Sequence, residues 1–342
     1  MTTITPGLGN PGSGRRVFCT ALATGALSLA IGRRGWASPD KPVIGVVVKI
    51  GGIPWFNAMQ AGIKKQAEAL GVNAFMVGPT SADPALQVRA IEDLIAQKVD
   101  VIGVVPNDAG VLEPVLARAR QGGIKVITHE SPKQVNTDWD FELASVEGFG
   151  SAYGRRMATA LGGKGGYAVF VGSLTVPLHN AWANAAIASI KAQNPDMHLI
   201  GDRYGVAEDV DASRSTALDL MSAHPDLKGI LAFGSQGPIG AARAVQERHL
   251  DGQVQVMGPF SPGQGRRLMQ QGALSGGFIW NPEVAGEVFV TLGTMVARGK
   301  SITDGTDIAG LGVVHPVGHD LIVDKLVELN KDTVGDLAKL GL

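Results

Sequence analysis

Aromatic and hydrogen-bonding side chains gather just after the first strongly apolar segment, in the sequence KIGGIPWFNAM at residues 49–59. Lys49 and Asn57 can form hydrogen bonds with hydroxyl groups, while Trp55 and Phe56 offer flat apolar faces. Only 5% of the chain is aromatic, so two adjacent rings beside polar groups are unusual for it. The combination is typical of a site for a small polyhydroxylated ligand. We interpret the segment as a loop after a strand.

Similar residue types follow other predicted strands. In open α/β sheets, ligands bind outside the carboxyl ends of the strands, so side chains at these ends are candidates for a site. Planar amides and carboxylates can form paired hydrogen bonds with the hydroxyls of a sugar. The further candidate ligand-binding residues are Asn107, Asp108, Glu130, His179, Asn180, Trp182, Ser235, Gln236, Trp280 and Asn281.

Each candidate also has a structural interpretation. Asn107 and Asp108 are residue types that turns favour, and Glu130 could cap the next helix. Trp182 has the helical spacing of a core residue, and His179 could be an ordinary hydrogen-bonded histidine. The position of all five near strand ends favours the ligand-binding interpretation.

Motifs for other chemistry are incomplete. GGKGG at 162–166 lacks the Ser or Thr that a phosphate-binding loop requires after its lysine. His315 and His319 are four residues apart, but the intervening Pro and Gly oppose the helix that would align them on a metal. We therefore expect no catalytic residue, no metal site and no cofactor. The alternative is a sugar-modifying enzyme that uses Glu130 and Asp108 as its carboxylate pair.

The pattern of elements favours an α/β fold. Apolar, β-branched segments such as 42–50 are typical of strands buried in a parallel sheet, and amphipathic helical segments such as 57–71 follow them. This alternation continues to about residue 131 and restarts at residue 151. It predicts two doubly wound parallel-sheet lobes that lie against each other.

The first 37 residues have the composition of an export signal. Arg15 and Arg16 precede an uncharged apolar segment from Ala21 to Ile31, and small residues follow up to Ala37. The arginine pair favours a twin-arginine signal over a general secretory one. Cleavage near Ala37 would leave a periplasmic chain with a net charge of −5 and no cysteine. A mildly acidic chain gives no reason to expect nucleic acid as a partner.

The export signal, the two lobes and the segments KIGGIPWFNAMQAGIKKQAEALGV, DLIAQKVDVIGVVPND and ITHESP resemble the type I periplasmic sugar-binding proteins of ABC importers. Within that group the sequence is most similar to the rhamnose-binding and autoinducer-2-binding branch. The resemblance implies lobes at 41–143 plus 281–312 and at 144–280 plus 313–342. It also implies three crossovers, and a cleft between the lobes that closes by hinge motion on the ligand.

The resemblance implies a function as well. The residues that fall on ligand-contacting positions of the family are Lys49, Trp55, Phe56, Glu130, His179, Asn180, Ser235, Gln236, Trp280 and Asn281. The resemblance implies that the protein delivers a neutral monosaccharide or sugar alcohol to an ABC permease as a monomer. Departures from the autoinducer-2 pattern at Leu178 and Phe233 place that ligand second. The same features also fit a receptor for a chemotaxis or sensor partner, and the fold fits the effector domain of a transcriptional regulator. The export signal argues against the regulator.

Overall fold

The computed structural model describes residues 41–339 and 341, so the predicted export signal at 1–37 lies outside the described residues. A six-stranded sheet forms the core of what we call the first lobe, with strand order β14-β5-β4-β3-β1-β2. All its strand pairs are parallel. Its strands are β1 (Val43–Val47), β2 (Asn73–Val77), β3 (Val101–Val104), β4 (Lys125–His129), β5 (Trp139–Glu142) and β14 (Asp320–Ile322).

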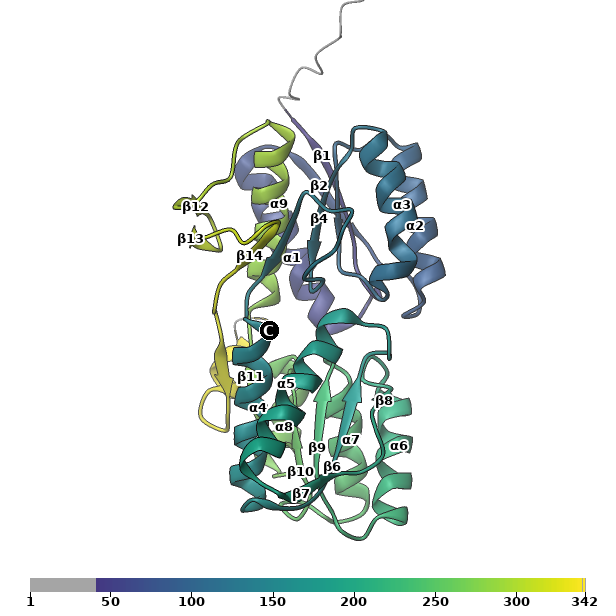
Figure 1. Cartoon of the computed structure of the whole chain (residues 1–342), viewed down its shortest axis with the longest axis vertical. Coiled ribbons are helices and arrows are strands. Elements are labelled where there is room, and N and C mark those ends of the chain that lie inside the picture. The colour runs from purple at the N-terminus through teal and green to yellow at the C-terminus, as the bar shows by residue number, and fades with distance from the viewer. Residues whose placement is uncertain (1–40, 340, 342) are drawn as a thin grey trace, which may run out of the picture. The chain divides into compact units, whose positions relative to one another are not determined.

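Helices cover both faces of this sheet, with α2 and α3 on one face and α1 and α9 on the other (Figure 1). The helices are α1 (Pro54–Leu70), α2 (Pro84–Ala96), α3 (Ala109–Gln121) and α9 (Pro282–Ala297). Asp83 caps α2 by accepting a hydrogen bond from the Ala85 N–H at 2.8 Å, and Pro84 is the first helical residue. This doubly wound arrangement follows from the strand-helix alternation of the sequence.

A five-stranded parallel sheet forms the core of the second lobe, with β10-β9-β6-β7 in order and β8 paired to β6. Its strands are β6 (Lys164–Val171), β7 (Asp196–Leu199), β8 (Tyr204–Gly205), β9 (Leu227–Phe233) and β10 (Gln255–Met257). Its helices are α4 (Val146–Leu161), α5 (Pro177–Gln193), α6 (Val210–Ala223), α7 (Gly237–Glu247) and α8 (Pro262–Gln270). Two doubly wound lobes are therefore present, as predicted.

The C-terminal segment contributes to both lobes. Antiparallel pairs form between β11 (Gly277–Ile279) and β15 (Val327–Leu329), and between β12 (Thr306–Ile308) and β13 (Gly312–Val314). The short helix α10 (Val334–Lys339) packs near α8. None of the helices among the described residues is long and apolar enough to cross a membrane.

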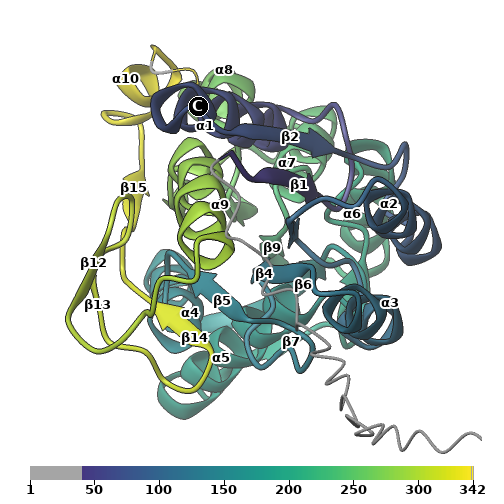
Figure 2. The ribbon, with the colours of Figure 1, turned by 90° about the horizontal axis from the view of Figure 1, so that it is seen from above.

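Two features of the first lobe differ from the sequence prediction. Strand β5 was not predicted, and β14 was assigned to the second lobe because it lies within 313–342. Instead, Asp320 to Ile322 pair in parallel with Asp140 to Glu142, beside β5 at the edge of the first sheet (Figure 2). The reason is that β14 covers the otherwise open backbone edge of β5. The third crossover therefore follows β14 and does not precede it.

The lobes are joined by three short connections, after β5, after β11 and after β14. The first and third are tied together. The Lys325 N–H donates to the Leu143 carbonyl at 2.8 Å, and the Ser145 N–H donates to Asp324 Oδ1 at 2.8 Å. These two connections thus form one hydrogen-bonded unit at the hinge.

Candidate ligand-binding site

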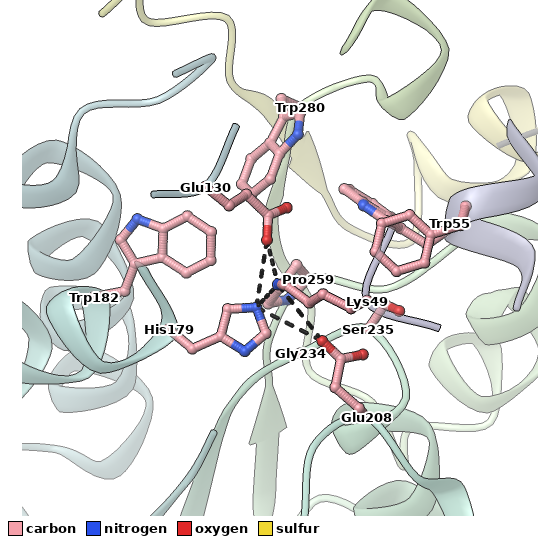
Figure 3. Close-up of a pocket in the computed structure, with 11 residues that line it drawn as sticks. Lys49, Trp55, Glu130, His179, Trp182, Glu208, Gly234, Ser235, Pro259 and Trp280 are labelled. Carbon is pink, nitrogen blue, oxygen red and sulfur yellow. Dashed lines mark hydrogen bonds and ion pairs between the residues drawn. The ribbon is translucent and has the colours of Figure 1, made fainter. Parts of the chain in front are cut away.

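A pocket lies at the carboxyl ends of strands from both sheets (Figure 3). Figure 3 shows a group of charged side chains with Trp55, Trp182 and Trp280 around it. The lining residues are Lys49, Trp55, Phe56, Glu130, His179, Trp182, Glu208, Gly234, Ser235, Pro259 and Trp280.

The first lobe supplies Lys49 and Glu130 from the carboxyl ends of β1 and β4, the two parallel strands on either side of β3. Lys49 follows β1, and its backbone carbonyl accepts a hydrogen bond from Asn107 Nδ2 at 2.9 Å. Glu130 directly follows β4 and has a φ of 59°, a left-handed conformation that is uncommon for a residue with a side chain. Such strain is frequent at functional sites, where the surrounding structure holds a side chain in a required direction.

The second lobe supplies His179 and Glu208. His179 lies in the first turn of α5, and its Nδ1 accepts a hydrogen bond from the Gly172 N–H at 3.1 Å. A neutral imidazole with this bond carries its hydrogen on Nε2, which faces the other charged groups. Glu208 lies between β8 and α6 and is 8% exposed. Both side chains therefore come from segments that follow strands of the second sheet.

These four side chains meet across the two lobes. The Lys49 ammonium pairs directly with Glu130 Oε2, and it lies 2.9 Å from His179 Nε2 and 3.7 Å from Glu208 Oε1. His179 Nε2 lies 3.7 Å from Glu130 Oε2 and 3.8 Å from Glu208 Oε1. All four residues are at least 92% buried, so water screens these charges weakly. We call Lys49, Glu130, His179 and Glu208 the charged cluster.

Burial and the lysine charge set the protonation states of the cluster. Burial alone would raise the pKa of Glu130, but the Lys49 ammonium and the interaction with His179 hold it well below its usual range. Burial and the Lys49 charge lower the pKa of His179 to about 4, so its imidazole is neutral near pH 7. Burial raises the pKa of Glu208 to about 7, because Lys49 offsets only part of the desolvation. Near pH 7 the cluster therefore holds one ionised carboxylate and one that titrates.

Aromatic side chains enclose the cluster. The ring centroids of Trp55 and Trp280 lie 5.5 Å apart at an interplanar angle of 89°, and those of Trp182 and Trp280 lie 5.2 Å apart. All three indoles are at most 4% exposed. Each can present an apolar surface to a ligand while its position is fixed by the other rings.

Eight of the fourteen residues predicted from the sequence line the pocket, from both lobes: Lys49, Trp55, Phe56, Glu130, His179, Trp182, Ser235 and Trp280. One local prediction was wrong. The segment after β1 is not a loop at Trp55 and Phe56, because α1 begins at Pro54, whose ring suits the first helical position. His179 and Asn180 lie in the first turn of α5, which begins at Pro177.

The other six predicted residues do not line the pocket, because local hydrogen bonds hold most of them elsewhere. Asp108 and Asn281 cap α3 and α9, respectively. Asn57 is exposed on α1, and the Asn180 amide group donates to the carbonyls at residues 173 and 176.

The remaining two residues support the lining. Asn107 is buried and holds the Lys49 carbonyl, while its own N–H donates to Gln87 Oε1 at 2.7 Å. Gln236 donates to Ser235 Oγ at 3.1 Å and accepts from Gln264 at 3.1 Å. The structure thus places both one layer behind the pocket.

Three lining residues were not predicted. Gly234 and Pro259 lie within strand-end segments that the sequence identified, but they lack the polar groups that were sought. Glu208 lies three residues after β8. The feature of the sequence that could have identified it is an acidic residue that follows a predicted strand. That signal was weak because acidic residues also favour the start of a helix, and α6 begins nearby. Among the described residues, no group of three His, Cys, Asp or Glu side chains could hold a metal ion.

Comparison with known proteins agrees with this architecture. The ribose import binding protein RbsB of Salmonella typhimurium is 22% identical over 291 residues, covering 83% of this chain and 94% of the relative. The solved structure of an ABC transporter solute-binding protein from Clostridium phytofermentas with bound L-rhamnose has a TM-score of 0.80 at 23% identity, covering 88% of this chain and 99% of that one. The structure of LsrB from Clostridium saccharobutylicum in complex with AI-2 also has a TM-score of 0.80, at 20% identity, covering 86% and 99%. The model of the periplasmic binding protein domain matches residues 44–301, so the chain belongs to the periplasmic binding protein family.

Proposed function

We propose that this protein is a solute-binding protein of an ABC importer that captures a neutral monosaccharide or sugar alcohol between its lobes and delivers it to a membrane permease. The observation that carries the proposal is the buried charged cluster, to which each lobe contributes two side chains inside an aromatic enclosure. The relatives whose names or titles mention ribose and L-rhamnose support a sugar ligand.

The hydrogen-bonding pattern of the cluster suits adjacent hydroxyl groups. The Lys49 ammonium is a donor, the carboxylate oxygens of Glu130 and Glu208 are acceptors, and His179 Nε2 lies among them. A hydroxyl oxygen can accept from the ammonium while its own hydrogen, or that of a neighbouring hydroxyl, is donated to a carboxylate. A ligand that lacks one of these hydroxyls would leave a buried charge without its partner, which costs affinity.

The size and charge of the pocket narrow the ligand class further. The four charged side chains already meet across the pocket and three tryptophans enclose them, so the pocket suits a single sugar unit better than an oligosaccharide. Because Lys49 and Glu130 balance one another, the site offers no net charge for a strongly ionic ligand while Glu208 is protonated. These properties support a neutral sugar or polyol.

We further infer that residues 1–37 are a twin-arginine export signal cleaved near Ala37, so that the mature protein acts in the periplasm. We also propose that it is a monomer and that it binds its ligand without converting it. The arginine pair and the apolar segment after it support export. Mass spectrometry of the mature N-terminus, with and without a functional twin-arginine pathway, would test both the cleavage position and the route.

A thermal-shift screen of the purified protein against pentoses, hexoses, deoxysugars, tetritols to hexitols and autoinducer-2 tests the ligand class. A ligand at 100 times its dissociation constant should stabilise the protein by about 2.7 kcal/mol. Trp55→Ala should remove the shift, whereas Glu68→Gln, at an exposed position on α1, should retain it. The absence of a shift with every sugar and polyol would refute the proposal.

The second candidate function is that of a receptor for autoinducer-2, and the similarity to the LsrB structure supports it. A shift with autoinducer-2 alone would favour that function over sugar import. Chemical analysis of the incubated ligand provides the test for turnover, because any conversion would contradict a binding function.

A further inference from the structure

A second group of buried acidic residues lies outside the pocket, at the edge of the first sheet. Asp140 and Glu142 are both on β5 and are 0% and 2% exposed. They are two residues apart in a strand, so their side chains extend from the same face of the sheet. In the register of the sheet, Asp140 pairs with Thr128 of β4 on one side and with Asp320 of β14 on the other. Three carboxyl groups therefore converge at one place.

Positive charge is missing around this pair within residues 41–339. Neither carboxyl oxygen of Asp140 has an N–H or O–H partner there, and Glu142 Oε1 also has none. The Thr128 hydroxyl and the Ser131 N–H are near Asp140, but the Thr128 hydroxyl donates to Thr137 Oγ1 at 3.3 Å. Two ionised carboxylates without partners at such burial would be very unfavourable.

The nearest histidine cannot supply the missing charge. His129 Nδ1 lies 3.8 Å from Glu142 Oε2, but it also lies 2.7 Å from the Phe141 carbonyl, to which it donates its hydrogen. Burial lowers the pKa of His129, so the ring is neutral near pH 7. Glu130, the next residue along, is itself negative and repels charge on Glu142.

Charged groups on the other neighbouring elements are engaged elsewhere. Glu113 of α3 accepts hydrogen bonds from the loop at 134–136 that follows β4, and Lys133 in that loop is exposed. Asp138, just before β5, interacts with Arg120 and Lys125 at 3.6 and 3.5 Å. A proton is therefore the simplest group that can neutralise the pair.

The pair also lies where the lobes are connected. Backbone carbonyls of Glu142 and Leu143 accept hydrogen bonds from the N–H groups of Val323 and Lys325, at 2.9 and 2.8 Å, and these four residues lie in or beside two of the three connections. We propose that Asp140 and Glu142 form a proton-binding site that holds β5 and β14 together, and that loss of this proton in alkaline medium loosens the hinge.

The direction of the stability change and its pH range follow from the difference in proton binding between the folded and unfolded states. Burial raises the pKa of Asp140 to about 8, and burial together with Asp140 raises the pKa of Glu142 well above its usual range. The folded state then binds more protons than the unfolded state. The stabilisation that Asp140 and Glu142 contribute is therefore greatest below about pH 4, and it is lost as the pH rises through about 8. The buried histidines are already neutral in this range, but Glu208 still titrates near pH 7, so a Glu208→Gln background isolates the pair.

The test uses the full chain with Glu208→Gln as the parent protein, and compares its urea unfolding from about pH 7 to 9 with that of the same chain carrying Glu142→Gln or Asp140→Asn. For each proton that the parent protein releases on unfolding, its unfolding equilibrium constant should rise about tenfold per pH unit. Either substitution should flatten this dependence, while Asp307→Asn, at an exposed carboxylate on β12, should leave it unchanged. An equal slope in the parent and in both pair variants would overturn the proposal.

Two further measurements keep the test decisive if a variant does not fold. Infrared spectra in a Glu208→Gln background should contain a protonated carboxyl band at about pH 7 that weakens as the pH rises through about 8. Hydrogen exchange, corrected for its intrinsic pH dependence, should then show peptides over 139–145 and 320–326 losing protection before the second sheet does. A missing band, or uniform loss of protection across both lobes, would contradict the assignment.

Discussion

Replacing Lys49 with methionine should expose how strongly the charged cluster depends on a single ammonium group. The side chain is 1% exposed and pairs directly with Glu130, which is 3% exposed. Methionine keeps most of the apolar stem while removing the charge. Breaking a buried ion pair from one side typically costs 3–5 kcal/mol, because the remaining charge has no partner.

Protonation of Glu130 limits this cost. A carboxyl group with an unfolded pKa of about 4.3 needs roughly 3.7 kcal/mol to hold a proton at pH 7. We therefore expect Lys49→Met to lower the free energy of unfolding by roughly 3 to 4 kcal/mol at pH 7. Since Glu130 has its pKa lowered only when Lys49 is present, the loss should shrink by about 1.4 kcal/mol per pH unit as the medium approaches pH 5.

Urea unfolding at about pH 7 and pH 5 provides the assay. Lys65→Met is the matched control, because Lys65 is 65% exposed and pairs with Glu283 and Glu287 on the surface, where water screens the charges; it should cost far less stability than Lys49→Met. The double variant Lys49→Met/Glu130→Gln should recover much of the lost stability. A loss that is small, independent of pH or unchanged in the double variant would refute the ion-pair reasoning.

Three further predictions test the site and the frame that holds it. Because the pKa of Glu208 is raised to about 7, affinity for the identified ligand should change between about pH 6 and 8 in the unsubstituted protein, and Glu208→Gln should abolish that change in titration calorimetry. Gly62→Ala should destabilise the protein by about 1–3 kcal/mol or more, since a Cβ there would lie 1.9 Å from the Glu283 carbonyl oxygen, whereas Gly335→Ala, in open space, should have little effect on thermal unfolding. Asp83→Ala should cost about 1 kcal/mol of unfolding free energy through loss of the α2 cap, and an unchanged melting temperature would contradict that role.

Local physics explains which parts of the fold were predictable. The strand within 42–50 and the amphipathic helix after it can be predicted from residue order alone, because the spacing of apolar residues differs between a buried strand and a helix. Lys49 and Glu130 were identified because parallel strands bring their carboxyl ends to one edge. Strand β14 was not, since its three residues have no pattern that separates them from a loop.

The sequence by itself determined the order of strands and helices, the two-lobed class and most of the pocket lining, because each depends on neighbours along the chain. Only the tertiary structure decided that Glu208 joins Lys49, while Asn281 and Asp108 turn back to cap helices. An acidic or amide side chain at a strand end can satisfy either role. Which one it adopts depends on charges and backbone donors from segments that are distant in sequence, and these meet only when the chain has folded.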